Sequence, residues 1–132
     1  GSTHLFDGAG ISRANTTTPQ ALMTYLQSLS ERATFPVIWY ALPIAGVDGT
    51  LENRMRGSAA EGVLRGKTGT LRGTYNLSGF VPTPGNPGDA PHFHPFVMLS
   101  STTEEMKALA RSTQDRVGAA LVRSFDCKTE CR

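Results

Sequence analysis

The sequence predicts a mixed α+β fold: helices come first, a three-stranded antiparallel meander follows, and a long helix comes last. Three observations support this prediction. Residues 19–30 and residues 103–125 repeat apolar side chains at helical spacing, and residues 63–100 hold three β-favouring runs separated by turn signals. With 132 residues, of which 39% are hydrophobic, the chain can form one domain or part of one.

The first helix is expected at 19–30. Thr18 is suited to cap it, and Pro19 suits the first helical position because its missing N–H has no partner there in any case. One apolar face is predicted by four residues that recur at helical spacing, Leu22, Tyr25, Leu26 and Leu29.

The next segment is less determined. Residues 37–42 are apolar and short, so they fit either a buried strand or a buried helical turn. A turn cluster follows at 46–49, and Thr50 is expected to cap a short helix that ends near Met55.

The meander is predicted from β-favouring runs and the turns between them. A turn signal at 71–73 joins the first two runs into a hairpin, and residues 82–91, with four prolines, predict a surface loop. Pro95 indicates an edge strand or a bulge in the third run. The three expected strands are 63–68, 74–81 and 93–100.

The last helix is expected over 103–125. Thr102 and Glu105 have the spacing of a capping box. One apolar stripe follows and is expected to pack in the core. Its members are Met106, Leu109, Ala110, Val117, Leu121 and Phe125.

Composition excludes several classes of protein. The net charge is +2, and the 13 basic residues are scattered rather than gathered in the patch that nucleic-acid binding requires. No apolar run approaches the length of a membrane-spanning helix. We therefore expect neither nucleic acid as a partner nor a membrane span in this chain.

Cysteine and histidine offer few metal ligands. Cys127 and Cys131 lie in an expected tail, residues 126–132, where they fit an extracytoplasmic disulfide or, alternatively, two free thiols. His92 and His94 alternate and so point the same way on a strand, but without further ligands a solvated loop end is the better interpretation. No metal or organic cofactor is expected.

Other chemically suggestive residues are better explained by structure. Asp7 and Asp48 each precede a glycine, and Asp-Gly is foremost a turn signal. Trp39 and Tyr75 are expected in the core.

The sharpest local motif is Gly66-Lys67-Thr68-Gly69-Thr70. A phosphate loop would need a glycine at position 61, which is Glu61, and a helix after the motif. The alternative is a strand that presents Lys67 and Thr68 to a serine acylation site, as in penicillin-binding proteins and β-lactamases. A cation and hydroxyl donors would hold the carboxylate of a substrate peptide, and the following backbone N–H would serve an oxyanion hole.

Two further landmarks accompany this motif in order and at matching spacing. One is the stretch 7–15 with Thr18-Pro19, and the other is 42–51 followed by Arg54 or Arg56; the motif itself continues through 73–80. Together these stretches resemble the D-alanyl-D-alanine carboxypeptidases/endopeptidases among the low-molecular-mass penicillin-binding proteins.

The resemblance implies the serine transpeptidase fold, a five-stranded antiparallel sheet with helices on both sides, of which residues 1–132 would be the C-terminal half. It implies that Lys67 acts in catalysis and in substrate binding. Thr68, Gly69 and Thr70 would complete the substrate strand, with Thr70 contributing its backbone amide to the oxyanion hole. Peptidoglycan stem peptides and β-lactams would be the ligands, at an extracytoplasmic location.

The sequence departs from the family pattern in its catalytic motifs. It contains no Ser-x-x-Lys and no Ser-x-Asn, and Ala9 stands where the family has a serine. We therefore expect this chain to be inactive alone and to pair with the missing N-terminal part of the enzyme or to self-associate. A catalytically inactive binding module and a serine β-lactamase fragment are the alternatives, although the stretch 48–51 argues against the latter.

Overall fold

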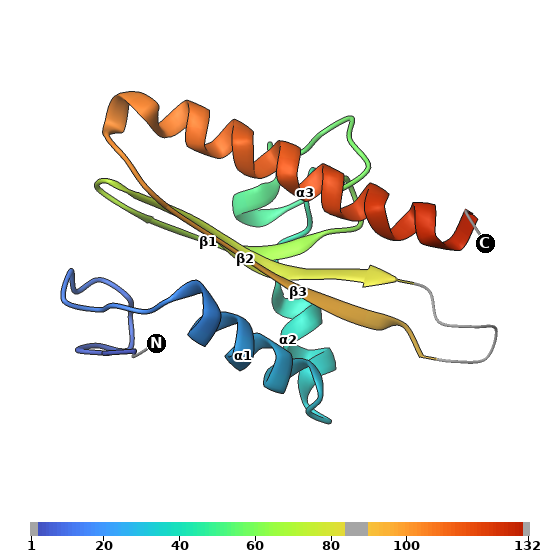
Figure 1. Ribbon diagram of the computed structural model, residues 1–132, viewed down its shortest axis with the longest axis horizontal. Helices are drawn as coiled ribbons and strands as arrows, with labels where there is room; N and C mark the ends of the chain where they lie inside the picture. Colours follow the sequence, from blue (N-terminus) through green and yellow to red (C-terminus); the bar gives the residue numbers. More distant parts are fainter. Residues whose placement is uncertain (1–2, 84–89, 131–132) are drawn as a thin grey trace.

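A three-stranded antiparallel sheet lies between two helical layers (Figure 1). The structure is a computed structural model that describes residues 3–83 and 90–130, and side chains as far as residue 125. Helix α3 covers one face of the sheet, and helices α1 and α2 lie on the other. This arrangement confirms the predicted α+β class and the order of its elements.

Helix α1 spans Pro19–Ser30, as expected, and the Thr18 hydroxyl accepts a hydrogen bond from the Ala21 N–H at 3.1 Å. The ambiguous apolar segment is helical and forms α2, Phe35–Ala41. The short helix expected from Thr50 to Met55 is instead a 3₁₀ turn, η1, at Gly49–Leu51. It cannot extend to Met55 because that residue adopts a left-handed φ of 62°.

The sheet has the order β1-β2-β3. Strands β1 (Arg65–Leu71) and β2 (Thr74–Thr83) form the predicted hairpin, with Gly73 at φ 81° in its turn. Strand β3 (His92–Ser101) pairs with β2 and is an edge strand of the described sheet, as Pro95 indicated. The middle of the expected 82–91 loop lies outside the described residues.

The final helix begins later and runs further than predicted. A 3₁₀ turn, η2 (Glu104–Met106), leads into α3 (Lys107–Glu130). The prediction of a capping box is wrong. Thr103 rather than Thr102 is the N-cap, and the Thr103 side chain makes no capping hydrogen bond. The expected tail is helical as far as Glu130, and the Cys127–Cys131 disulfide lies outside the described residues and stays a prediction.

The main core lies between the sheet and α3, where Leu64, Leu77 and Val122 are buried. A smaller cluster of Leu26, Phe35 and Phe80 fills the opposite face.

The prediction that the whole stripe of α3 packs in the core is wrong. Met106, Leu109 and Val117 are 44%, 56% and 43% exposed, whereas Leu121 and Phe125 do pack against the main core. The helix turns Gln114, Ala119 and Val122 toward the sheet instead. None of the helices in the described part of the chain has the length and apolarity needed to cross a membrane.

Candidate functional site

The Lys-Thr-Gly motif lies on β1, at the outer edge of the sheet. The start of this edge is hydrogen-bonded to another segment: the Gly66 N–H donates to the Pro43 carbonyl at 3.0 Å, on the side of β1 away from β2. Backbone groups of an antiparallel strand alternate between its two sides. The N–H groups of Thr68 and Thr70 therefore point to the same free edge as that of Gly66.

Side chains on β1 alternate between the two faces of the sheet. Thr68 pairs with Leu77 and Thr70 with Tyr75, both of which lie beneath α3, so the two hydroxyls face the α3 side. Lys67 is exposed; its Nζ donates to the Thr68 carbonyl at 2.6 Å and makes no ion pair with any described residue.

Two hollows flank this edge, and both are lined by Lys67, Thr68 and Thr70. One, of about 450 Å³, lies toward α3, and the other, of about 600 Å³, lies toward the N-terminal loop. A larger hollow between residues 53–58 and α3 is lined by none of the motif residues. We place the candidate site at the β1 edge because free backbone donors, hydroxyls and a cation converge there.

The N-terminal loop forms one wall of the site and is organised around Asp7. Its carboxylate accepts hydrogen bonds from the N–H groups of residues 9–12 at 2.6–3.2 Å and from the Asn15 amide. The Ser12 N–H bond is the main cause that lowers the pKa of Asp7. Arg13 then ties the loop to the hairpin by donating to the Arg72 carbonyl at 2.9 Å.

Both Asp-Gly carboxylates are structural, as the sequence indicated. Asp7 closes the N-terminal loop, and Asp48 Oδ1 accepts a hydrogen bond from the Ile44 N–H at 2.6 Å.

Trp39 packs against Phe35 and Phe93, with the Arg65 guanidinium 4.8 Å from its ring centroid.

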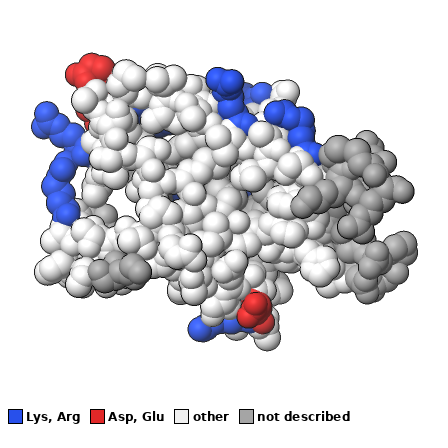
Figure 2. All heavy atoms as spheres, in the orientation of Figure 1, with Lys and Arg blue, Asp and Glu red and all other residues white. Residues whose placement is uncertain are grey.

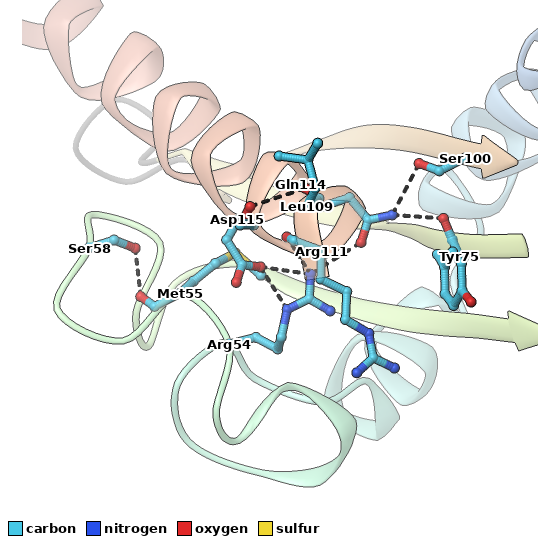
Figure 3. Close-up of polar contacts among 10 residues, drawn as sticks. Arg54, Met55, Ser58, Tyr75, Ser100, Leu109, Arg111, Gln114 and Asp115 are labelled. Carbon is cyan, nitrogen blue, oxygen red and sulfur yellow. Dashed lines mark hydrogen bonds and ion pairs between the residues drawn. The ribbon is translucent and has the colours of Figure 1, made fainter. Parts of the chain in front are cut away.

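A polar network between α3 and the loop after η1 was not predicted from the sequence (Figure 3). Arg54 Nη2 and Nε lie 2.7 and 2.8 Å from Asp115 Oδ1, and Nη2 also donates to Gln114 Oε1 at 3.1 Å. Gln114 is 3% exposed and donates in turn to the Tyr75 carbonyl at 2.8 Å. Arg54 is 60 residues from Gln114 and Tyr75 is 39 residues from it, so no local pattern could reveal these contacts.

Tyr75 is buried beneath the start of α3. Desolvation and the neighbouring Glu104 carboxylate raise the pKa of Tyr75, while its hydroxyl is the main cause that lowers the pKa of Glu104. Tyr75 is therefore neutral at physiological pH and belongs to the core, as expected.

His92 is the exposed first residue of β3, at the end of the preceding loop, whereas His94 lies within the strand and is half-buried. His94 Nε2 and Thr83 Oγ1 are 3.0 Å apart, and the His94 ring stacks on Phe125. Among the residues that the structure describes, no three His, Cys, Asp or Glu side chains lie close enough together to hold a metal ion.

Comparison of sequences relates the chain to carboxypeptidases. The profile of the D-Ala-D-Ala carboxypeptidase 3 (S13) family matches residues 1–119. A D-alanyl-D-alanine carboxypeptidase of Actinomadura sp. is 48% identical over 86 residues, which are 61% of this chain and 16% of that protein. D-alanyl-D-alanine carboxypeptidase DacB of Haemophilus influenzae is 36% identical over 84 residues, 61% of this chain and 17% of that protein.

Comparison of structures gives the same relation. The crystal structure of Haemophilus influenzae penicillin binding protein 4 superposes with a TM-score of 0.59 and 28% identity, covering 89% of this chain and 28% of that one. The same protein complexed with a β-lactam gives a TM-score of 0.61 and 28% identity, with coverage of 87% and 28%. The chain thus spans less than a third of each of these relatives.

Proposed function

The chain belongs to the D-Ala-D-Ala carboxypeptidase 3 (S13) family, and we propose that it supplies the substrate-binding strand of a serine-type D-Ala-D-Ala carboxypeptidase that acts on peptidoglycan stem peptides. β-Lactams would acylate the same site. The reaction is acyl transfer: a serine Oγ attacks the carbonyl carbon, the terminal D-Ala leaves, and water hydrolyses the acyl-enzyme ester.

The observation that carries this proposal is the free edge of β1. In one short stretch it offers the Lys67 ammonium, two hydroxyls, and an outward N–H at Thr70. The hydroxyls and cation suit the substrate carboxylate, and the Thr70 N–H suits the oxyanion that forms during attack. Gly69 adds no side chain that would keep the substrate from the strand.

The nucleophile and its base belong to the rest of the protein. The chain has neither Ser-x-x-Lys nor Ser-x-Asn and spans 16% of its Actinomadura relative. The partner of this chain is then the upstream part of the same enzyme, for which residues 1–132 form the C-terminal half of the catalytic domain. Peptidoglycan as substrate places the enzyme outside the cytoplasmic membrane, where a Cys127–Cys131 disulfide can form.

Intact-mass spectrometry after incubation with penicillin tests the proposal. The natural polypeptide containing these residues should form one covalent adduct and should release D-Ala from a D-Ala-D-Ala peptide. The 132-residue chain alone should do neither, because it cannot open an acyl bond without a nucleophile.

Two results would overturn the assignment. A natural polypeptide that binds the peptide but forms no adduct would instead be an inactive binding module on this scaffold. An adduct on the isolated chain would place the nucleophile within these residues.

A further inference from the structure

Resting on the proposed function, we propose that Arg111 of α3 is a specificity-determining residue that binds the terminal carboxylate of the ligand from the helix side of the site. It lines the hollow of about 450 Å³ between the sheet and α3, opposite the hydroxyls of Thr68 and Thr70. The other lining residues are Thr50, Arg54, Lys67, Tyr75, Asn76 and Gln114.

Arg54 lines the same hollow, but its charge is paired with that of Asp115. Its guanidinium lies 2.7 Å from Asp115 Oδ1 and also donates to Gln114 Oε1 and to the Arg111 carbonyl, both at 3.1 Å. The Arg54 and Asp115 side chains are only 13% and 27% exposed, so their pairing is shielded from solvent. Arg54 therefore builds the wall of the hollow, with its Nε and Nη2 engaged and its charge balanced by Asp115.

Arg111 is the opposite case. Asp115 lies four residues further along α3, at the spacing where helical side chains normally pair, but Arg54 holds it. Figure 3 shows the Arg111 side chain extending away from Asp115. Among the described residues its guanidinium makes no ion pair and no hydrogen bond, and its backbone carbonyl alone enters the network. The Arg54–Asp115 pair thus leaves the Arg111 charge available.

The lining of the hollow selects an anion. It carries the unbalanced charges of Lys67 and Arg111, hydroxyls at Thr68 and Thr70, and no described acidic side chain. A guanidinium matches a carboxylate through two parallel hydrogen bonds. Because the free edge of β1 borders this hollow, a peptide or penicillin lying along β1 would present its carboxylate between the two hydroxyls and Arg111.

The test compares benzylpenicillin, which has a free carboxylate, with its methyl ester, using the natural polypeptide and acylation rates from intact mass. The wild type should react faster with the acid. Arg111→Gln should lose about tenfold in the rate with the acid, as expected for a lost charged hydrogen bond, and should keep the ester rate within about twofold. Arg111→Lys should retain part of the preference for the acid.

Arg116→Gln is the matched control, because Arg116 is an exposed arginine on α3 that lines the larger hollow and not this one. It should leave both rates unchanged. If Arg111→Gln keeps the wild-type ratio or lowers both rates equally, the role of Arg111 is refuted while the proposed function stands. If the wild type reacts with neither compound, the proposed function itself fails.

Discussion

The two outer edges of the described sheet differ in chemistry, although each lacks a neighbouring strand over most of its length. The β1 edge is polar, with Lys67, Thr68 and Thr70 between two hollows. The β3 edge borders a hollow of about 530 Å³ whose lining includes the apolar side chains Met98 and Leu109.

This difference indicates what kind of partner each edge can bind. Hydroxyls and cations lose solvation when buried against protein without exact pairing, so the β1 edge suits a small charged ligand that pairs with them. Apolar side chains beside an unpaired strand favour another polypeptide, either the upstream part of the enzyme or a second copy of this chain. In the view of Figure 2, Lys and Arg are scattered along the margins of the molecule, some of them where α3 runs, and most of the face is uncharged.

The largest expected effect comes from Lys67→Ala in the natural polypeptide. Because Lys67 is exposed and pairs with no described acid, its charge serves the ligand more than the fold. Acylation by a fluorescent penicillin should fall by about 10²–10³-fold, while the melting temperature stays nearly unchanged. A wild-type acylation rate would remove Lys67 from the site.

Gly79→Ala tests whether the geometry of the β1 edge depends on close strand packing. A Cβ at Gly79 would lie 2.6 Å from Gly66 Cα and would also collide with the Arg65 carbonyl. We expect chemical denaturation to show a loss of about 2–3 kcal/mol of unfolding free energy, in the range of overpacking. Gly8→Ala is the control, since its Cβ would meet nothing within 4 Å; equal stabilities would contradict this packing.

Leu99→Lys addresses the other edge. If the isolated chain self-associates through β3, a charge at this 36% exposed position should weaken dimerisation about tenfold in sedimentation equilibrium, about 1.4 kcal/mol. Val37→Lys places the same charge on the exposed face of α2 and should change nothing. Equal weakening by both variants would show that the association does not involve β3.

The smallest effect concerns the loop that backs the β1 edge. Because its hydrogen bonds lower the pKa of Asp7 below the usual 3.8, the folded state gains stability from the carboxylate above that pH. The gain is lost as pH falls through the lower, folded-state pKa. Melting curves of the wild type and Asp7→Asn should therefore differ near neutral pH and converge in acid. A difference that persists at the lowest pH would contradict this.

The sequence predicts those parts of the fold that depend on neighbouring residues. Thr18-Pro19 marks the start of α1, and the turn before Thr74 marks the hairpin, because caps and tight turns are local. The rotation of α3 is not local. Its buried Gln114 is bonded to Arg54 and to the Tyr75 carbonyl, and this pairing outweighs the apolar stripe through Leu109.

The same distinction applies to the site. The motif at 66–70 identified the strand, and the turn-forming role of Asp7 followed from the glycine after it. The absence of an acidic partner for Arg111 among the described residues could not be predicted. It depends on which of two arginines binds Asp115, and Arg54 is 61 residues away from Asp115 in the sequence.

Hydrogen exchange of the natural polypeptide, with and without bound penicillin, tests most directly the claim that β1 is the ligand edge and β3 is not. Amides in peptides covering 66–71 should exchange more slowly after acylation, because the outward N–H groups of Thr68 and Thr70 become bonded or covered. Peptides covering 93–101 should exchange at the same rate in both states. Protection of 93–101 with no change at 66–71 would contradict the account.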